Sequence, residues 1–261
     1  MKRRLFVLAA ALAGLAFADD AIRIPLSDPG RPGHAVVHTL NGSIHITVGA
    51  PGVVAVDTKE ERHRDRDRSE RADGLHRIPM QRGLQAEEAD NVVTISAGPP
   101  QADGDIFVQV PPNTSVKAGS VSGDVTVDGV NGDIEIDATN GKAVLTNVSG
   151  SVVAHSLNGG VKADIVRVAP DKAMSFSSLN GDINVTLPPD TKARLKMKTD
   201  NGELYTDFDV VLERSGAAVV ENQGGKHRIK QDRTAYGTIN GGGPEMSFTS
   251  FNGNIYIRKR K

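Results

Sequence analysis

The chain has 261 residues, with 31 Lys and Arg against 32 Asp and Glu, and a formal net charge of −1. A chain so evenly charged lacks the global field that recruits nucleic acid or anionic lipid. Cysteine is absent, which excludes disulfides, Cys-ligated metals and Cys nucleophiles. Aromatic residues make up 4% of the chain and 28 residues are glycine, a composition that indicates many short strands joined by tight turns.

Residues 1–18 are typical of a bacterial Sec-type signal peptide. A basic start precedes an apolar stretch from Leu5 to about Leu15, and the A-x-A sequence Ala16-Phe17-Ala18 follows. A membrane anchor would need roughly 20 apolar residues, and Asp19 ends this stretch too early. We therefore expect cleavage after Ala18, a periplasmic or secreted protein, and no stable membrane insertion once the signal is removed.

Residues 19–118 are expected to form an N-terminal β region, because 34–57 and 91–118 alternate apolar with polar residues. The charged insert at 59–90 lies between these stretches, and we interpret it as a long loop or a short surface helix. Acidic residues such as Glu60 and Glu61 are interleaved with its arginines, which argues against a nucleic-acid patch.

Residues 119–261 contain an internal repeat with a period of nine. Five units in unbroken register begin at Ser122, Asn131, Asn140, Ser149 and Asn158, and an isolated early copy begins at Leu40. Each unit reads (Asn/Ser)-Gly-x-Φ-x-Φ, where Φ is an aliphatic residue, and the dipeptide accepts the positive φ of a sharp turn. The predicted turn residues are Gly123, Asn131, Gly132, Asn140, Gly141, Gly150, Asn158, Gly159, Asn180, Gly181, Asn201, Gly202, Asn252 and Gly253.

The apolar residues of each unit alternate with polar ones, which predicts a strand with one buried face. Nine residues are too few for a strand and a helical crossover, so a βαβ arrangement is excluded. The predicted core residues are Val125, Val127, Ile134, Ile136, Leu145, Val152, Val161, Ile183, Val185, Ile255 and Ile257.

Two all-β architectures fit such units: a meander of hairpins with type I′ turns, or a β-solenoid whose strands stack in parallel. The constant offset of the apolar pair favours a right-handed parallel β-helix with about 18–20 residues per coil. The N-terminal strands would pack as its first coils, so that 34–257 forms one continuous domain. Asparagine recurs at one corner, where stacked amides could form a hydrogen-bonded ladder.

Two later segments depart from the repeat. Residues 211–238 are expected to form a β-excursion or longer coil loops. The basic cluster Arg258-Lys259-Arg260-Lys261 is interpreted as a charged cap that blocks edge-to-edge pairing at the end of the solenoid.

The chain resembles the exported bacterial β-strand-repeat family called "putative adhesins", of the DUF4097 type. The resemblance rests on the run VQVPPNTSVKAGSVSGDVTVDGVNGDIEI and on SSLNGDINVTLPPDTKARLKMKTDNGEL, and it covers roughly 34–57 and 91–257. It implies a right-handed β-helix-like fold, an envelope location and the adhesive role of the family name, with no catalytic motif to carry over.

A calcium repeat and a carbohydrate-active enzyme are the two functional alternatives. Asp follows Gly in the units only at Asp124, Asp133 and Asp182, whereas calcium needs six to eight converging oxygens. Glycoside hydrolysis needs two carboxylates across a bond, but alternation places Glu135 and Asp137 on the solvent face. The seven histidines include no HExxH sequence.

The sequence therefore identifies no catalytic, cofactor-binding or metal-binding residue. We expect a non-enzymatic exported β-solenoid that acts as an adhesin or as a structural or binding module of the cell envelope. Its expected partner is an unidentified envelope polymer or protein, not nucleic acid. A β-helix enzyme acting on an envelope polysaccharide is the first alternative, and a calcium-dependent repeat protein is the second.

Overall fold

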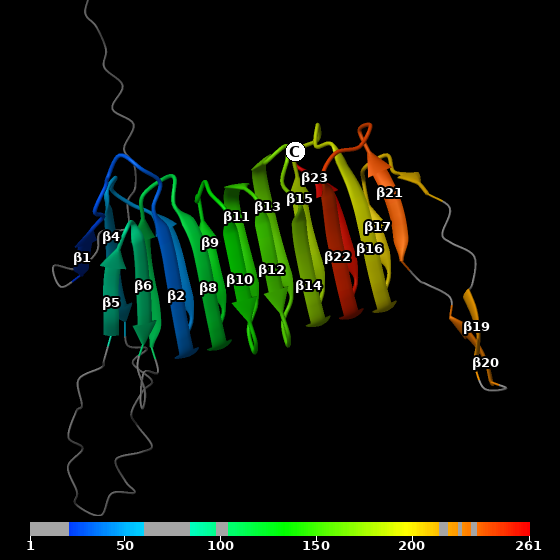
Figure 1. The fold of residues 1–261 in the computed structure, drawn as a ribbon, viewed down its shortest axis with the longest axis horizontal. Helices are drawn as coiled ribbons and strands as arrows, with labels where there is room; N and C mark the ends of the chain where they lie inside the picture. Colours follow the sequence, from blue (N-terminus) through cyan, green and yellow to red (C-terminus); the bar gives the residue numbers. More distant parts are fainter. Residues whose placement is uncertain (1–20, 60–83, 98–103, 214–218, 224–225, 231–233) are drawn as a thin grey trace, which may run out of the picture.

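The computed structural model describes residues 21–59, 84–97, 104–213, 219–223, 226–230 and 234–261. All the regular elements in these ranges are β-strands, so the expected all-β class is confirmed (Figure 1). No helix among the described residues is long and apolar enough to cross a membrane. The predicted signal peptide, residues 1–18, lies outside the described residues.

Most strands lie in two large sheets that run side by side along an elongated stack (Figure 1). The ten-stranded sheet contains, in spatial order, β1 (Ile22–Pro25), β4 (Val53–Lys59), β7 (Asp105–Val110), β3 (Ile44–Val48), β9 (Val125–Asp128), β11 (Ala143–Gly150), β13 (Val161–Val168), β15 (Ile183–Leu187), β23 (Ile255–Lys259) and β17 (Leu204–Thr206).

The eleven-stranded sheet contains, in spatial order, β18 (Val211–Leu212), β21 (Ala235–Ile239), β16 (Ala193–Asn201), β22 (Glu245–Asn252), β14 (Met174–Asn180), β12 (Val152–Ser156), β10 (Ile134–Ala138), β8 (Ser115–Ser122), β2 (His34–Asn41), β6 (Val92–Ala97) and β5 (Leu84–Ala89). A separate hairpin consists of β19 (Val219–Gln223) and β20 (Lys226–Lys230).

Consecutive repeat units lie in alternate sheets, and each strand pairs in parallel with the strand two units, 18 residues, along the chain, which gives a β-solenoid-like fold. In one sheet β10 pairs with β12, with Ile134 opposite Val152, and in the other β9 pairs with β11, with Val125 opposite Ala143. The meander alternative is wrong, because its consecutive strands would pair in antiparallel hairpins. We call one strand from each sheet, with the corner between them, a coil.

The coils do not stack in chain order. The coil of β2 and β3 lies against β6 and β7 on one side and against β8 and β9 on the other. The last coil, β22 and β23, lies between the coil of β14 and β15 and the coil of β16 and β17 (Figure 1). The early copy from Leu40 and the last copy from Phe251 therefore stack inside the solenoid.

Antiparallel strands make both sheets mixed, which corrects the expectation of a parallel helix throughout. At one end β4 pairs with β7 and β1 with β4, while β5 pairs with β6. At the other end β21 pairs with β16, and β18 with β21. Antiparallel strands thus end both sheets at the first end of the stack and the eleven-stranded sheet at the other end, in place of further parallel coils.

Two sequence-based interpretations are wrong. The insert at 59–90 is not wholly loop or helix, because Leu84–Ala89 forms the edge strand β5; its residues 60–83 lie outside the described residues. The terminal basic cluster is not an end cap, because β23 is an interior strand. Arg260 of this cluster instead contacts other coils, since it donates to Asn147 (2.9 Å) and lies 3.4 Å from Asp164.

The inward residues of the two sheets form one apolar core. The structure places all the predicted core residues there, each at most 2% exposed: Val125, Val127, Ile134, Ile136, Leu145, Val152, Val161, Ile183, Val185, Ile255 and Ile257. Phe176 and Phe248 are also buried and stack with ring centroids 5.2 Å apart. Their contact joins β14 to the inserted strand β22.

Glycine is required at the corners mainly because stacked backbones approach closely there, and less because of positive φ. A Cβ on Gly141 would lie 2.0 Å from the carbonyl oxygen of Gly123, and one on Gly159 would lie 2.2 Å from that of Gly141. Among the predicted turn residues, positive φ occurs at Gly123 and Gly150, while the non-glycine residues with positive φ lie elsewhere. Positive φ is therefore used at only some of the predicted turn dipeptides.

Stacked polar side chains fasten the same corner. Asn158 donates from Nδ2 to Asn140 Oδ1 and accepts from Asn180 Nδ2, both at 2.9 Å. The row continues from Asn252 to Asn180 and from Asn201 to Asn252, so the expected amide ladder is present. Because an amide donates and accepts at once, each asparagine between the two ends of this row bonds to the coils on both sides.

Candidate binding surface

The aspartates that suggested calcium sites have a structural role between coils. Asp124 accepts the backbone N–H of Lys142 (2.7 Å), and Asp182 accepts that of Asn254 (2.8 Å). Asp133 pairs with Lys172 at 2.6 Å. In the described ranges, no three or more His, Asp or Glu residues are grouped as metal ligands would be.

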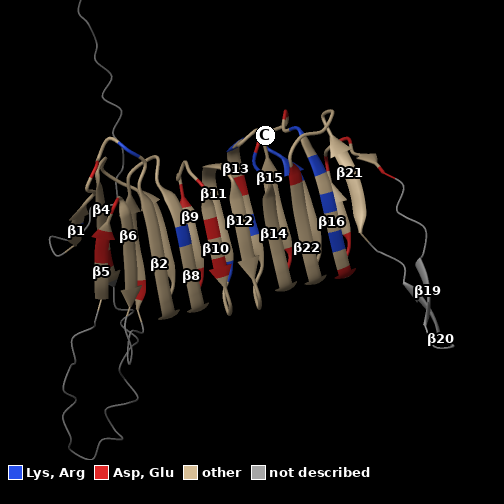
Figure 2. Cartoon of the chain, viewed as in Figure 1, with Lys and Arg blue, Asp and Glu red and all other residues tan. Residues whose placement is uncertain are grey.

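The outward residues of the eleven-stranded sheet stand in rows across the strands. One row runs through Ser96, His38, Gly119, Asp137 and His155, on β6, β2, β8, β10 and β12 in turn. The neighbouring row contains Lys117 and Glu135, which form an ion pair at 2.8 Å. Figure 2 shows these charges on β8 and β10 in the middle of the sheet.

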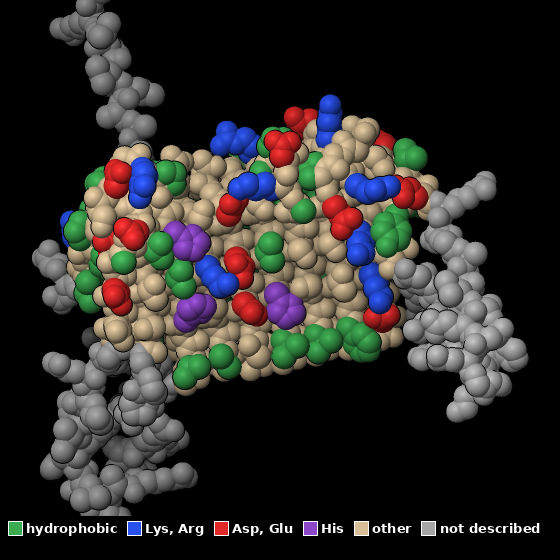
Figure 3. Space-filling model, in the orientation of Figure 1, with side chains coloured by type: hydrophobic (Ala, Val, Ile, Leu, Met, Phe, Trp, Pro, Cys, Tyr) green, Lys and Arg blue, Asp and Glu red, His purple; other side chains and the backbone are tan. Residues whose placement is uncertain are grey.

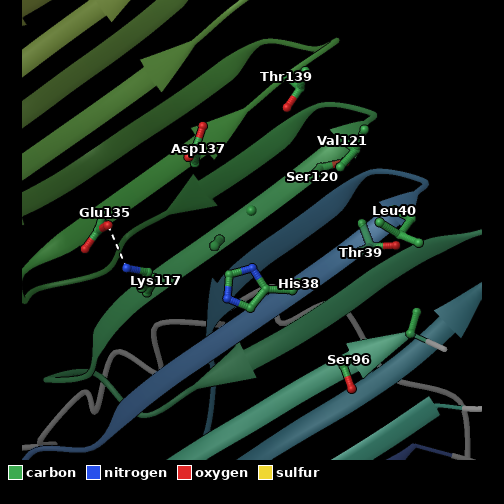
Figure 4. A pocket seen from close by; sticks show the side chains of 13 residues that line it. His38, Thr39, Leu40, Ser96, Lys117, Ser120, Val121, Glu135, Asp137 and Thr139 are labelled. Atoms are coloured by element: carbon green, nitrogen blue, oxygen red, sulfur yellow. Dashed lines mark hydrogen bonds and ion pairs between the residues drawn. The ribbon is translucent and has the colours of Figure 1, made fainter.

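A shallow groove of about 370 Å³ crosses these rows at Gly119. Because Gly119 has no side chain, the His38 imidazole can lie over it: a Cβ there would come within 2.9 Å of His38 Nδ1, and the Asp137 side chain stands on the next strand (Figure 4). The strands that carry His38 and Asp137 are two inter-strand spacings apart, about 9.6 Å. The Lys117–Glu135 pair lies at one side of the groove, and Leu40 and Val121 lie at the other.

Leu40 and Val121 belong to an exposed row of apolar side chains beside the asparagine ladder. We call Leu40, Val121, Leu157, Leu179 and Phe251 the apolar ridge; the polar Thr139 lies between Val121 and Leu157 in the same row. Four of its members are between 39% and 57% exposed, and Leu157 is half-buried. Figure 3 shows apolar side chains along this edge, with histidines and charged groups on the face above it.

The ridge and the groove together form one surface with an apolar border and a polar floor. Exposed apolar side chains that line up in a row, unlike scattered ones, are typical of interaction sites. In the sequence each ridge residue directly precedes an Asn-Gly or Ser-Gly dipeptide, but the same position in other units holds buried residues such as Val130 and Val148. Its alignment depends on the stacking register.

The outer face of the ten-stranded sheet carries a different feature. The rings of Tyr205 and Tyr256 stack with centroids 5.0 Å apart, and Arg258 lies over Tyr256 at 5.2 Å. The Tyr205 hydroxyl donates to the Glu203 carboxylate, and this bond raises the pKa of Tyr205 above its ordinary value. The sequence did not reveal this pair, because the two tyrosines belong to coils out of chain order.

The comparisons with known proteins agree with the family indicated by the repeats. The family model described as Toastrack DUF4097 matches residues 101–257. This chain belongs to the DUF4097 family. No curated protein matches its sequence.

Two solved structures are similar to this chain. A "putative cell adhesion protein" from Clostridium sporogenes is 12% identical, with a TM-score of 0.44, and the match covers 92% of this chain and 99% of that one. A "putative adhesin" from Bacteroides fragilis is 11% identical, with a TM-score of 0.30, over 93% and 98% of the two chains. TM-scores this low carry no argument about a binding site.

Proposed function

We propose that this DUF4097 protein is an exported, non-enzymatic, adhesin-like binding module of the bacterial cell envelope. Its binding surface would be the groove at Gly119 with the apolar ridge, and its ligand an envelope polymer or protein. The observation that carries the proposal is the alignment of these features on one face of a rigid stack. A long ligand could contact several coils in succession, because the repeats present equivalent positions at each strand spacing.

The groove is poorly arranged for glycoside hydrolysis. Its carboxylates, Glu135 and Asp137, extend from the same face of one strand, β10. Hydrolysis needs an acid and a nucleophile or base on opposite sides of the glycosidic bond, whereas Glu135 is held in an ion pair with Lys117 at 2.8 Å. This geometry supports binding rather than catalysis.

The proposal includes cleavage of residues 1–18 and a right-handed stack of coils. The distance along the chain between stacked asparagines is 18 residues for Asn140 and Asn158, and 22 for Asn158 and Asn180. Parallel strands joined through a second layer connect with a right-handed turn in about 98% of known cases. The basic start, the apolar stretch and the A-x-A sequence support export.

The test is co-sedimentation of the exported protein with isolated cell-envelope fractions. Gly119→Tyr would displace the His38 ring, which a Cβ there would approach to 2.9 Å, and would fill the groove. Thr126→Tyr adds the same side chain to the outer face of the other sheet as a matched control. We expect Gly119→Tyr to weaken sedimentation at least tenfold and Thr126→Tyr to leave it unchanged, with or without a chelator. The mass of the exported protein should correspond to a chain that begins at Asp19.

Three results would contradict parts of the proposal. Absence of binding to every fraction would overturn the adhesive role. Equal binding by both variants would move the site away from the groove, and loss of binding on chelation would favour the calcium alternative.

A further inference from the structure

Strand β17 leaves an open edge on the ten-stranded sheet. Among the described residues it is the last strand of that sheet, with β23 as its one neighbour there. Leu204 and Tyr205 are 38% and 46% exposed, and Thr206 is exposed as well. Leu204 stands opposite Ile255, which is fully buried, so Leu204 occupies a core position that no further coil covers in this sheet.

The backbone of β17 directs hydrogen-bonding groups towards the open edge, where one more parallel strand could pair with them. Along the sheet, the backbone N–H of the first inward-facing residue of a strand donates to a carbonyl oxygen in the next coil. These bonds run from Val161 to Asp182, from Ile183 to Asn254, and from Ile255 to Glu203, at 2.9–3.0 Å. The next donor in this series is Leu204 N–H. Since backbone groups alternate in direction along a strand, Leu204 and Thr206 direct theirs away from β23, towards the open edge.

The side chains of β17 indicate what an added strand should carry. Its residue opposite Leu204 would point inward and should be apolar. Its residue opposite Tyr205 would meet the free face of that ring, since Tyr256 already covers the other face, and stacked aromatic rings prefer such offset contacts. The favoured pattern is therefore apolar–aromatic–apolar.

The charges beside β17 favour a basic segment and disfavour a second copy of this edge. Glu203 precedes the strand, and Asp207 and Asp209 follow it. On the side of β17 that β23 occupies, Lys259 contacts two of these acidic residues. Its backbone N–H donates to the Asp207 carboxylate, and its ammonium group lies 3.6 Å from the Asp209 carboxylate. Two copies of β17 paired antiparallel would instead bring like charges together, which destabilises cross-strand pairs.

We propose that the open edge of β17 is a docking site for an extended segment of another polypeptide, with the pattern apolar–aromatic–apolar followed by Lys or Arg. The segment adds a parallel strand by backbone hydrogen bonding, and its side chains supply the specificity. This surface lies on the other sheet from the groove, so its test does not depend on the proposed envelope ligand.

The probe is a fluorescent, end-blocked peptide with the sequence of residues 253–259, the segment that already pairs with β17 from its other side. Binding to the exported full chain is measured by anisotropy. Methylating the peptide nitrogen of the tyrosine removes an N–H that faces Leu204 of β17, whereas methylating that of the following isoleucine modifies the far edge. We expect the first peptide to bind at least tenfold more weakly than the second.

Charge reversal provides the second comparison. Asp209→Lys should weaken binding several-fold, whereas Glu245→Lys, at an exposed position on the other sheet, should leave it unchanged; thermal melting of both variants checks that they fold. Equal binding of the two methylated peptides would overturn the proposal, as would no binding at about 1 mM peptide. The proposal would also be overturned if the protein formed a concentration-dependent dimer and if the tyrosine-methylated and unmethylated peptides dissociated that dimer equally.

Discussion

Replacing Gly141 by alanine should force two coils apart at the asparagine corner. The new Cβ would lie 2.0 Å from the carbonyl oxygen of Gly123, whereas carbon and oxygen atoms in close contact lie about 3.3 Å apart. The obstacle is backbone on both sides, so no side-chain rotation relieves the overlap. The coils must separate locally by about 1.3 Å, the difference between these two distances.

Such a separation breaks the hydrogen bonds that cross this corner. Asn140 N–H donates to Val121 O at 2.9 Å, Lys142 N–H to Asp124 Oδ1 at 2.7 Å, and Val125 N–H to Lys142 O at 2.9 Å. Three bonds at about 1 kcal/mol each give a loss of about 3 kcal/mol in the free energy of unfolding. For a chain of this size the melting temperature should fall by about 6–12 °C.

Gly241→Ala is the matched control. Gly241 has φ +86°, and a Cβ there would meet nothing within 4 Å, so its cost is backbone strain alone, about 1 kcal/mol. Urea unfolding followed by far-ultraviolet circular dichroism measures both variants. If Gly141→Ala costs no more than Gly241→Ala, close approach of the coils is not why glycine occupies this corner.

The order of the coils and the contact between β5 and the segment after β1 give two more predictions. Ending the chain after Gly243 should unfold much of the stack, because it removes β22 and β23 from between two coils, with the buried residues Phe248 and Ile255. Each of these side chains contributes about 1.5–3 kcal/mol; a truncated chain that still melts cooperatively near the parent temperature would contradict the insertion. Glu88 accepts hydrogen bonds from the N–H and hydroxyl of Ser27 (3.0 and 2.8 Å), and the backbone bond first of all lowers its pKa. Its stabilisation is therefore complete above the unfolded pKa of about 4.3 and is lost as pH falls through the lower folded value. The protection factors for amide hydrogen exchange in β1 and β5, which are corrected for the intrinsic pH dependence of exchange, should fall on acidification in the parent and fall less in Glu88→Gln; identical pH profiles would refute this role.

Much of the fold could be predicted from local sequence. Alternation decides which side chain of a strand faces inward, so Ile134, Ile136 and their equivalents were assigned before the stacking was known. The amide ladder also followed from the repeat, because residues at one position of every unit align once like stacks on like. These inferences depend on neighbouring residues and on period alone.

The candidate surfaces could be predicted less well, because they combine residues from coils that are not consecutive. The groove requires Gly119 to lie between His38 and Asp137, and His38 belongs to the early strand β2. The tyrosine stack requires β23 to lie beside β17. One signal for the inserted coil was available: SFSSLNG at 175–181 resembles SFTSFNG at 247–253, and the two segments pair in register with Phe176 opposite Phe248.

The sequence by itself determined the strand units, their buried faces and the corners where glycine and asparagine recur. Only the tertiary structure decided the order of the coils, and with it the groove, the apolar ridge and the open edge of β17. The physical reason is that every unit offers nearly the same backbone and apolar face to its neighbour. Pairing energy is then similar for many orders, and the choice depends on contacts between distant segments, such as Phe176 with Phe248 and Tyr205 with Tyr256.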